Sequence, residues 1–123
     1  MEHNCVGWFE VYVQDMARAK KFYETVFKYK LQRLDIPGPE MWSFPMEMNV
    51  PGASGALVKM EGVASGGNSV LVYFSCADCA VEESWVTQCG GHVTKPKTVI
   101  GTYGFISLVL DTEGNMIGLH SMK

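Results

Sequence analysis

The stretch that decides the fold is residues 8–23, which read WFEVYVQDMARAKKFY. Its first part is an apolar run rich in β-forming residues, which predicts a strand. Asp15 follows, and Asp favours helix N-termini because its carboxylate accepts hydrogen bonds from free backbone N–H groups. Apolar residues then recur at helical spacing from Met16 to Val26. The stretch therefore predicts a strand followed by an Asp-capped helix.

Residues 71–86, LVYFSCADCAVEESWV, repeat this pattern. Asp78 lies 63 residues after Asp15, close to half of the 123-residue chain. Gly90 and Gly91 suit the end of the second helix. Three strand-like stretches follow each helix, near 29–36, 41–48 and 54–60 and near 92–99, 103–110 and 115–122. The sequence predicts one α+β domain over residues 1–123, built of two βαβββ modules at 5–63 and 69–123 with a linker at 66–68.

Composition excludes several classes of protein. Ten Lys and Arg against thirteen Asp and Glu give a net charge of −3, which argues against nucleic-acid binding and a basic membrane-surface patch. No apolar run approaches the roughly 20 residues of a membrane-spanning helix. The first residues show no secretory signal, so we expect a cytoplasmic protein. Its four cysteines are then expected to be reduced and buried.

Two motifs resemble those of the vicinal oxygen chelate superfamily, which includes glyoxalases, bleomycin resistance proteins and extradiol dioxygenases. They are VQDMARAKKFY at 13–23 and VLDTEGNMIGL at 109–119, with Thr112 in place of the usual Pro. The resemblance covers essentially the whole chain. It implies a cupped, mostly antiparallel sheet around a central cavity, helices packed outside, and a homodimer. These motifs indicate the fold well and the reaction poorly.

The resemblance also implies where metal ligands would lie, on the first and last strands of each module. Those positions carry Trp8, Val70 or Leu71, Gly118, and the apolar stretch 55–58. None of these side chains offers a lone pair to a divalent cation, so we expect no metal and no cofactor. Glu10 and His120 lie two residues further along and point to the same faces. Two protein ligands make a weak metal site, which favours hydrogen-bonded polar roles inside the cup.

Aromatic and Met side chains predict an apolar ligand pocket. Alternation in 41–48 places its even-numbered residues on one face, while Trp8 and Tyr12 share the face of Glu10. The candidate ligand-binding residues are Trp8, Tyr12, Trp42, Phe44, Met46 and Tyr103. Glu10 and His120 are the candidate polar anchors or catalytic groups.

Cys76 and Cys79 have C-x-x-C spacing, which can indicate a redox or zinc site. No second pair follows, and Cys76 is expected in a strand. We interpret both as small apolar thiols packed in the core.

Three functions remain open. The first is metal-independent binding of a small apolar or planar molecule, as in the bleomycin resistance proteins that the chain resembles. The second is a metal-dependent lyase, isomerase or dioxygenase of the glyoxalase type with an atypical site. An enzyme of this kind that uses no metal would instead need Glu10 as general base and His120 as general acid. The third is a dimeric module whose own aromatic side chains fill the cavity.

Overall fold

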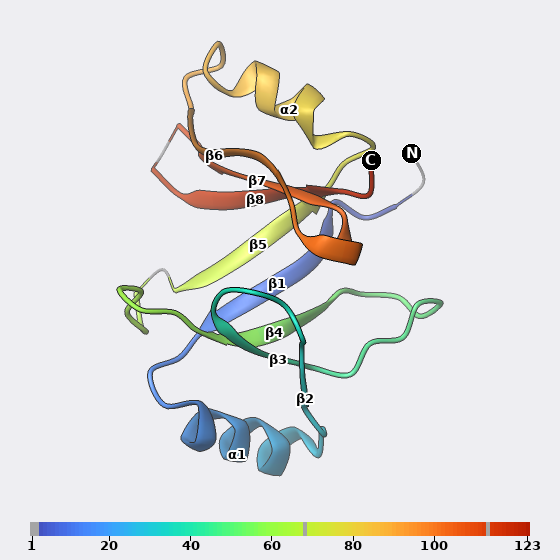
Figure 1. Cartoon of the computed structure of the whole chain (residues 1–123), viewed down its shortest axis with the longest axis vertical. Helices are drawn as coiled ribbons and strands as arrows, with labels where there is room; N and C mark the ends of the chain where they lie inside the picture. The colour runs from blue at the N-terminus through green and yellow to red at the C-terminus, as the bar shows by residue number, and fades with distance from the viewer. Residues whose placement is uncertain (1–2, 68, 113) are drawn as a thin grey trace. The chain divides into compact units, whose positions relative to one another are not determined.

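The computed structural model describes residues 3–67, 69–112 and 114–123 (Figure 1). Their contacts divide the chain into two compact units. One unit is Trp8–Val70, and the other combines Leu71–Lys123 with the described residues up to Gly7. The backbone N–H of Ser75 donates to the carbonyl of Cys5, which ties this N-terminal segment to the second unit.

The elements of the first unit are β1 (Val6–Tyr12), α1 (Met16–Phe27), β2 (Gln32–Arg33), β3 (Glu40–Ser43) and β4 (Ser54–Lys59). Its strands are ordered β2-β3-β4-β1. β1 runs parallel to β4, whereas β3 is antiparallel to both β2 and β4. A helix that follows the first strand and three strands that return beside it make the βαβββ unit predicted from the sequence.

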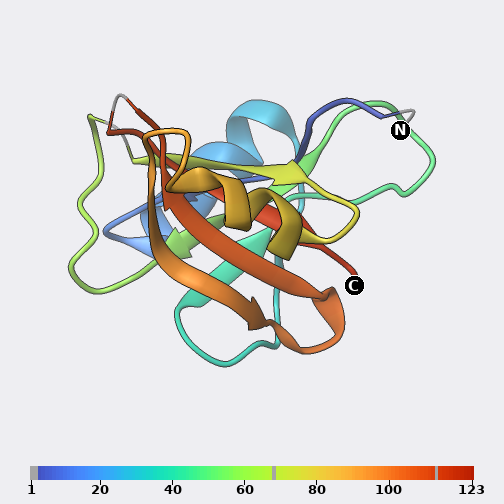
Figure 2. The same ribbon diagram turned by 90° about the horizontal axis from the view of Figure 1, so that it is seen from above.

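The second unit contains β5 (Val70–Ser75), α2 (Cys79–Val86), β6 (His92–Val99), a 3-10 turn (Gly101–Tyr103), β7 (Phe105–Leu110) and β8 (Met116–Ser121). Its strand order is β5-β8-β7-β6, with β5 parallel to β8. Figure 2 shows α2 lying across β6, β7 and β8. Both units thus have the same strand pairing, and the predicted fold class is confirmed. The cup and its central cavity stay predictions.

Both aspartates cap helices, as predicted. The Asp15 carboxylate accepts a hydrogen bond from the backbone N–H of Arg18 at 3.1 Å, and that of Asp78 accepts one from Ala80 at 3.0 Å. The α2 helix ends at Val86, four residues before Gly90, so the predicted end was too late.

Several predicted strands are shorter in the structure. The stretch 41–48 leaves the sheet after Ser43, because Pro45 has no backbone N–H to donate to a ladder. In the stretch 29–36 the strand is confined to Gln32 and Arg33, although the backbone N–H of Leu34 also donates to the carbonyl of Met41. Of the predicted linker and the turn at 111–115, Asn68 and Glu113 lie outside the described residues.

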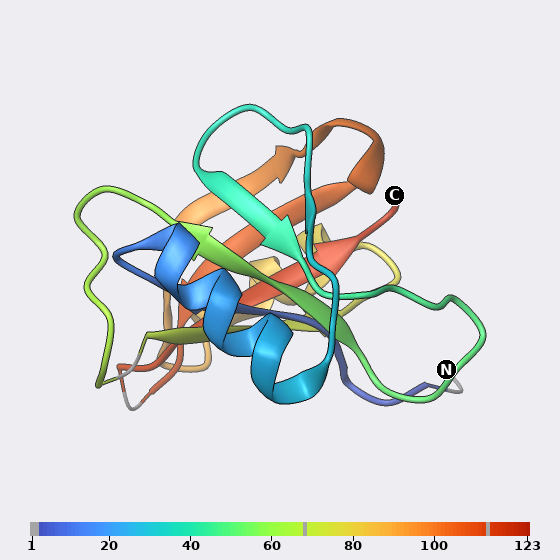
Figure 3. The same ribbon diagram turned by 90° about the horizontal axis from the view of Figure 1, so that it is seen from below.

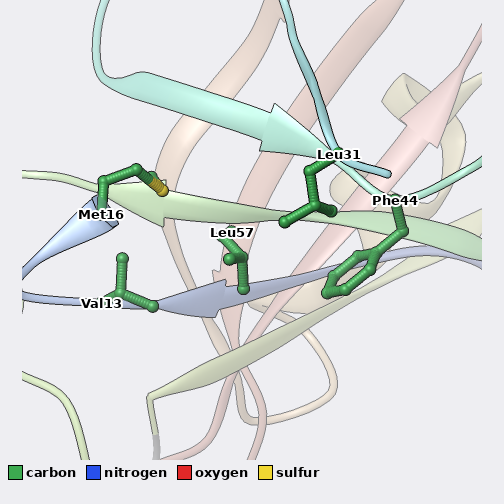
Figure 4. Packing of buried hydrophobic residues seen from close by; sticks show 5 residues of the cluster. All are labelled: Val13, Met16, Leu31, Phe44 and Leu57. Carbon is green, nitrogen blue, oxygen red and sulfur yellow. The ribbon is translucent and has the colours of Figure 1, made fainter. Parts of the chain in front are cut away.

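The core of the first unit lies between α1 and the sheet. Figure 3 shows α1 crossing β1 and β4, and Figure 4 shows the buried side chains beneath it. They are Val13, Met16, Leu31, Phe44 and Leu57. Leu57 lies at the centre of β4 and is fully buried. This cluster decides which face of the sheet the helix covers.

In the second unit, Cys79 packs with Val109 and Leu119. All four cysteines are free, but Cys5 and Cys89 are exposed, so the expected burial is wrong for these two. Neither helix in the described part of the chain has the length and hydropathy needed to cross a bilayer.

The Leu57→Ala substitution should lower the free energy of unfolding by about 2–5 kcal/mol, because it removes buried methyl groups and leaves a cavity. Urea denaturation followed by circular dichroism measures the loss. Met48→Ala is the matched control: Met48 is 93% exposed, and its truncation should change stability by less than about 0.5 kcal/mol. Equal effects of both substitutions would contradict the described core.

Candidate functional site

Strand β1 sends its side chains alternately to two faces of the first unit. Phe9 and Val11 pack in the cluster beneath α1. Trp8 and Tyr12 pack on the other face, and they contact a second cluster made of Met41, Ala56 and Val58. Glu10 lies between Trp8 and Tyr12 in the strand, so it shares their face. We call this the Glu10 face.

Glu10 is a buried carboxylate, only 8% exposed. One carboxylate oxygen accepts a hydrogen bond from the indole Nε1–H of Trp8 at 3.3 Å. The other accepts one from the hydroxyl of Tyr12 at 2.8 Å. Burying a charge is costly unless hydrogen bonds compensate for lost water, and these two donors supply part of that compensation. The carboxylate is therefore a fixed acceptor set among aromatic and aliphatic groups.

The neighbouring strand leaves space for this carboxylate. In the parallel pairing of β1 and β4, Ala56 is the register partner of Glu10, and it is fully buried. A larger residue at position 56 would compete with the Glu10 side chain for the same face. Sequence reasoning missed Ala56, Met41 and Val58. A small residue in a buried strand was the available signal for Ala56.

The surroundings of Tyr12, including Glu10, shift the pKa of its phenol. Burial raises the pKa of the Tyr12 phenol well above its ordinary value of 10.0, and the charge and hydrogen bond of Glu10 raise it further. A phenol with a raised pKa keeps its proton, so Tyr12 stays a hydrogen-bond donor to Glu10 at neutral pH.

Two predicted pocket residues lie on the opposite side of the sheet. The Trp42 ring lies 3.4 Å from the Nζ atom of Lys20 on α1, and Phe44 is buried beneath α1 against Phe9. Trp42 and Phe44 therefore pack on the helix side and not with Trp8, and their role as ligand-binding residues stays a prediction. Met41 is the β3 residue that reaches the Glu10 face, because alternation sends it opposite to Trp42.

Met46 and Tyr103 do not lie in strands. Met46 follows Pro45 and is largely exposed, so the alternation expected through 41–48 does not reach it. Tyr103 lies in the 3-10 turn, and β7 begins only at Phe105. Their roles as ligand-binding residues stay predictions that no strand geometry supports.

His120 of β8 is held by Tyr103. Its Nε2 lies 2.6 Å from the backbone carbonyl oxygen of Tyr103. A carbonyl oxygen only accepts hydrogen bonds, so Nε2 must carry the proton in this contact. Glu10 and His120 belong to different units, and a joint catalytic role stays a prediction.

The positions where the superfamily's metal ligands would lie do not suit a cation. The indole of Trp8 donates rather than accepts, and the stretch 55–58 is buried and apolar. A Cβ atom added to Gly118 would overlap the ring of Tyr73, its register partner in β5. In the described ranges there is no group of three or more His, Cys, Asp or Glu side chains that could hold a metal ion. The donor set at these positions therefore does not fit a metal.

The helix side of the first unit has a hollow of about 320 Å³ that sequence reasoning missed. It is lined by Phe9, Val11, Tyr23, Phe27, Tyr29, Phe44, Pro45, Ala53 and Ser54. The rings of Tyr23, Phe27 and Tyr29 stack in sequence, with centroids about 6 Å apart. In the sequence, the feature that could have indicated this hollow is the high number of aromatic residues in 22–29. Phe44 thus lines a hollow, but this hollow lies beneath α1 and not on the Glu10 face.

The C-x-x-C pair does not have the character of a redox site. Cys79 is fully buried at the start of α2. Burial raises the pKa of the Cys76 thiol to about 11, and the neighbouring carboxylate of Glu82 contributes to that rise. A reactive thiol needs a lowered pKa. Both cysteines therefore fit the interpretation as packed thiols.

Comparison with known proteins agrees with this geometry. A family model described as bleomycin resistance protein-like N-terminal matches residues 6–45, which include all of β1. The chain has the fold of the vicinal oxygen chelate superfamily. The resemblance stated from the sequence is thereby confirmed at the level of the fold. Among curated proteins, no sequence matches the chain.

Solved structures support the same fold. The methylmalonyl-CoA epimerase of Mycobacterium tuberculosis matches with a TM-score of 0.72 and 12% identity, over 97% of this chain and 88% of that chain. The Streptomyces coelicolor epimerase in complex with 2-nitronate-propionyl-CoA matches with a TM-score of 0.69 and 12% identity, over 98% of both chains. A hypothetical protein of Bacillus halodurans matches with a TM-score of 0.74 and 12% identity, over 96% and 94%. Identities this low identify the fold alone.

The Tyr12→Phe substitution tests the hydrogen bond to Glu10, because the loss of stability that it causes should depend on pH. Because the folded-state pKa of Tyr12 is raised, its contribution to stability is complete below about pH 10 and is lost as pH rises further. Near pH 8 the variant should be less stable than the wild type by about 1–3 kcal/mol. Above pH 10 the gap should narrow, as measured by urea midpoints across pH.

The matched control is Trp8→Phe, which removes the other donor to Glu10 but no titrating proton. It should lower the free energy of unfolding at pH 8. Above pH 10, that free energy should fall with pH as steeply as it does in the wild type. A gap between wild type and Tyr12→Phe that stays constant with pH would contradict the arrangement.

Proposed function

We propose that the protein binds a small apolar or planar molecule on the Glu10 face without using a catalytic metal. The single observation that carries this proposal is the buried Glu10 carboxylate held by Trp8 Nε1 and Tyr12 Oη. A few fixed polar atoms within apolar surroundings are what small-molecule sites generally use to orient a ligand. Here the fixed polar atoms are acceptors, so the ligand should carry an N–H, an O–H or a cationic group.

The apolar part of the ligand has suitable neighbours. Trp8 and Tyr12 flank Glu10 and pack with Met41 and Val58. Indole and phenol rings offer flat faces for stacking, and an adjacent Met adapts to irregular shapes. The match of residues 6–45 to a bleomycin resistance protein-like model supports ligand binding, and the matched segment contains Trp8, Glu10 and Tyr12.

Proton-transfer catalysis is the second candidate. Two solved neighbours are methylmalonyl-CoA epimerases, and Glu10 is a carboxylate in apolar surroundings that could act as a base. Against this, the Nε2 proton of His120 is engaged by Tyr103 and not available as a general acid without breaking that contact. Deuterium uptake at the α-carbon of methylmalonyl-CoA in D₂O, measured by mass spectrometry, would favour this candidate if Glu10→Gln abolished it.

Ligand binding is tested on the full chain with planar probes. Thermal-shift screening should compare aromatic amines such as naphthylmethylamine with neutral hydrocarbons of the same shape, and calorimetry should then give affinities. The amines should bind more tightly, because a charge-assisted hydrogen bond to Glu10 adds to stacking. Glu10→Gln should weaken amine binding by at least about tenfold and leave hydrocarbon binding nearly unchanged.

Two control variants separate this site from the rest of the molecule. Glu47→Gln changes an exposed carboxylate outside the site, and Phe27→Ala opens the hollow beneath α1. Neither should alter amine binding. Loss of binding in Phe27→Ala but not in Glu10→Gln would assign the ligand to the helix side and contradict the proposal.

A further inference from the structure

Four aromatic side chains lie in a closed cycle of contacts around the hollow beneath α1. The ring centroids of Tyr23 and Phe27 are 6.0 Å apart, and those of Phe27 and Tyr29 are 5.7 Å apart. Phe44 completes the cycle, because its ring centroid lies 5.9 Å from that of Tyr29 and 5.5 Å from that of Tyr23. We call these four side chains the aromatic box. All four of them line the hollow.

The aromatic box has a buried floor and exposed walls. Phe44 is buried, and its side chain reaches towards β1, where it packs against Phe9 (Figure 4). Phe27 is 51% exposed and Tyr29 is 43% exposed. The hollow of about 320 Å³ falls in the range of small-molecule sites, roughly 300–1,000 Å³. A ligand bound here would cover aromatic surface that otherwise lies in water.

The backbone at the end of α1 places Tyr29 in the box. Residues two apart in a helix point to nearly opposite sides, so Tyr29 could not stack on Phe27 if α1 continued. The helix ends at Phe27, and Lys28 has a φ of 62°, in the left-handed region that favours glycine. Outside glycine, the described residues include no other positive φ. Strained conformations of this kind are concentrated at ligand-binding and active sites.

The opposite wall of the hollow is held by a hydrogen bond between the two ends of the loop that joins β3 to β4. The Ser54 hydroxyl donates to the carbonyl of Pro45 at 2.9 Å, and it lies 3.2 Å from the carbonyl oxygen of Phe44. Pro45, Ala53 and Ser54 all line the hollow. The wall is therefore built from chain ends that are fixed to each other.

The polar groups at the hollow favour a ligand that accepts hydrogen bonds. In the described ranges, neither the Tyr23 nor the Tyr29 hydroxyl has a hydrogen-bond partner. A phenol hydroxyl donates readily to an anionic oxygen, and such charge-assisted bonds are the stronger kind. Both hydroxyls are therefore available as donors to a bound molecule.

The charges next to Tyr29 favour an anion. Lys28 and Lys30 precede and follow it, and both are exposed. The Lys28 Nζ donates to the carbonyl of Thr25, which leaves Lys30 as the ammonium group without a partner in the described ranges. The Glu24 carboxylate is engaged by a backbone N–H at 3.0 Å. A set of aromatic rings can also attract a cation, but these lysines oppose that choice.

We propose that the hollow beneath α1 is a second binding site, which takes a planar aromatic carboxylate. The flat part of the ligand lies in the aromatic box, and its carboxylate accepts hydrogen bonds from the Tyr29 hydroxyl and the Lys30 ammonium group. Phe9 and Phe44 belong to the cluster beneath α1, whereas Trp8 and Tyr12 pack on the other face of the sheet. The site is thus separate from the Glu10 face, and it takes a ligand of the opposite charge.

Calorimetric titration of the full chain with 2-naphthoate tests this site. Wild type should bind one naphthoate per chain. The neutral 2-naphthamide has a similar shape and should bind at least about fivefold more weakly, because it lacks the charge that strengthens the hydrogen bonds. An excess of naphthylmethylamine, the probe for the Glu10 face, should not displace the naphthoate.

Substitutions in the box should weaken naphthoate binding. Phe27→Ala removes one wall and should raise the dissociation constant by at least about tenfold. Tyr29→Phe keeps the ring and removes only the hydroxyl, so it tests the hydrogen bond without changing the packing. It should raise the dissociation constant by about fivefold. Lys30→Gln should also weaken naphthoate binding, and it should bring the affinity closer to that of naphthamide.

Two matched variants serve as controls. Phe22→Ala makes the same change on the same helix, and Phe22 contacts Tyr23 but does not line the hollow. Glu10→Gln alters the other face of the sheet. Both should leave the naphthoate dissociation constant within about twofold of wild type. Circular dichroism verifies that each variant is folded.

Several results would overturn the second site. They are no binding of naphthoate to wild type, equal binding of naphthoate and naphthamide, displacement by the amine, and equal losses in Phe22→Ala and Phe27→Ala. Loss of naphthoate binding in Glu10→Gln but not in Phe27→Ala would also overturn it. Failure of the proposed function has a different signature: the amine would not bind, or would bind Glu10→Gln as well as wild type, while naphthoate binding stayed intact.

Discussion

The alternation of side chains along β1 is the constraint on which the first unit depends. A strand sends successive residues to opposite faces, so one short segment both builds the core and presents polar chemistry. Its odd-numbered residues, including Phe9 and Val11, pack beneath α1. Its even-numbered residues hold the Glu10 carboxylate between Trp8 and Tyr12. A shift of one residue in register would exchange the two sets and bury the carboxylate in the apolar core.

The two modules have the same strand pairing but different chemistry. In the first unit Ala56 is the register partner of Glu10, and in the second Gly118 is the partner of Tyr73. Each half thus sets a small residue on its last strand beside a larger one on its first strand. Where the superfamily's metal ligands would lie, the first unit has an indole and the second an aromatic ring over a glycine. The same backbone geometry therefore carries side chains that do not suit a cation at these positions.

The two units also differ in the charge of the residues around their helices. Positive charge is concentrated around α1 and negative charge around α2, although the two helices occupy equivalent places in their modules. The exposed aromatic residues Phe22 and Trp85 lie at corresponding positions on these helices. The two modules thus share exposed apolar positions but differ in the charge around them.

The sequence by itself determined the two modules, because capping aspartates and hydrophobic periodicity act locally and need no knowledge of distant residues. It also placed Trp8, Glu10 and Tyr12 on one face of their strand, since alternation is a property of a single strand. Only the tertiary structure decided which face of β3 meets the helix. Both faces of that strand are apolar, with Met41 on one and Trp42 on the other, so periodicity alone could not choose between them. The choice depends on pairing Trp42 with Leu57, a contact between strands whose register the local sequence does not encode.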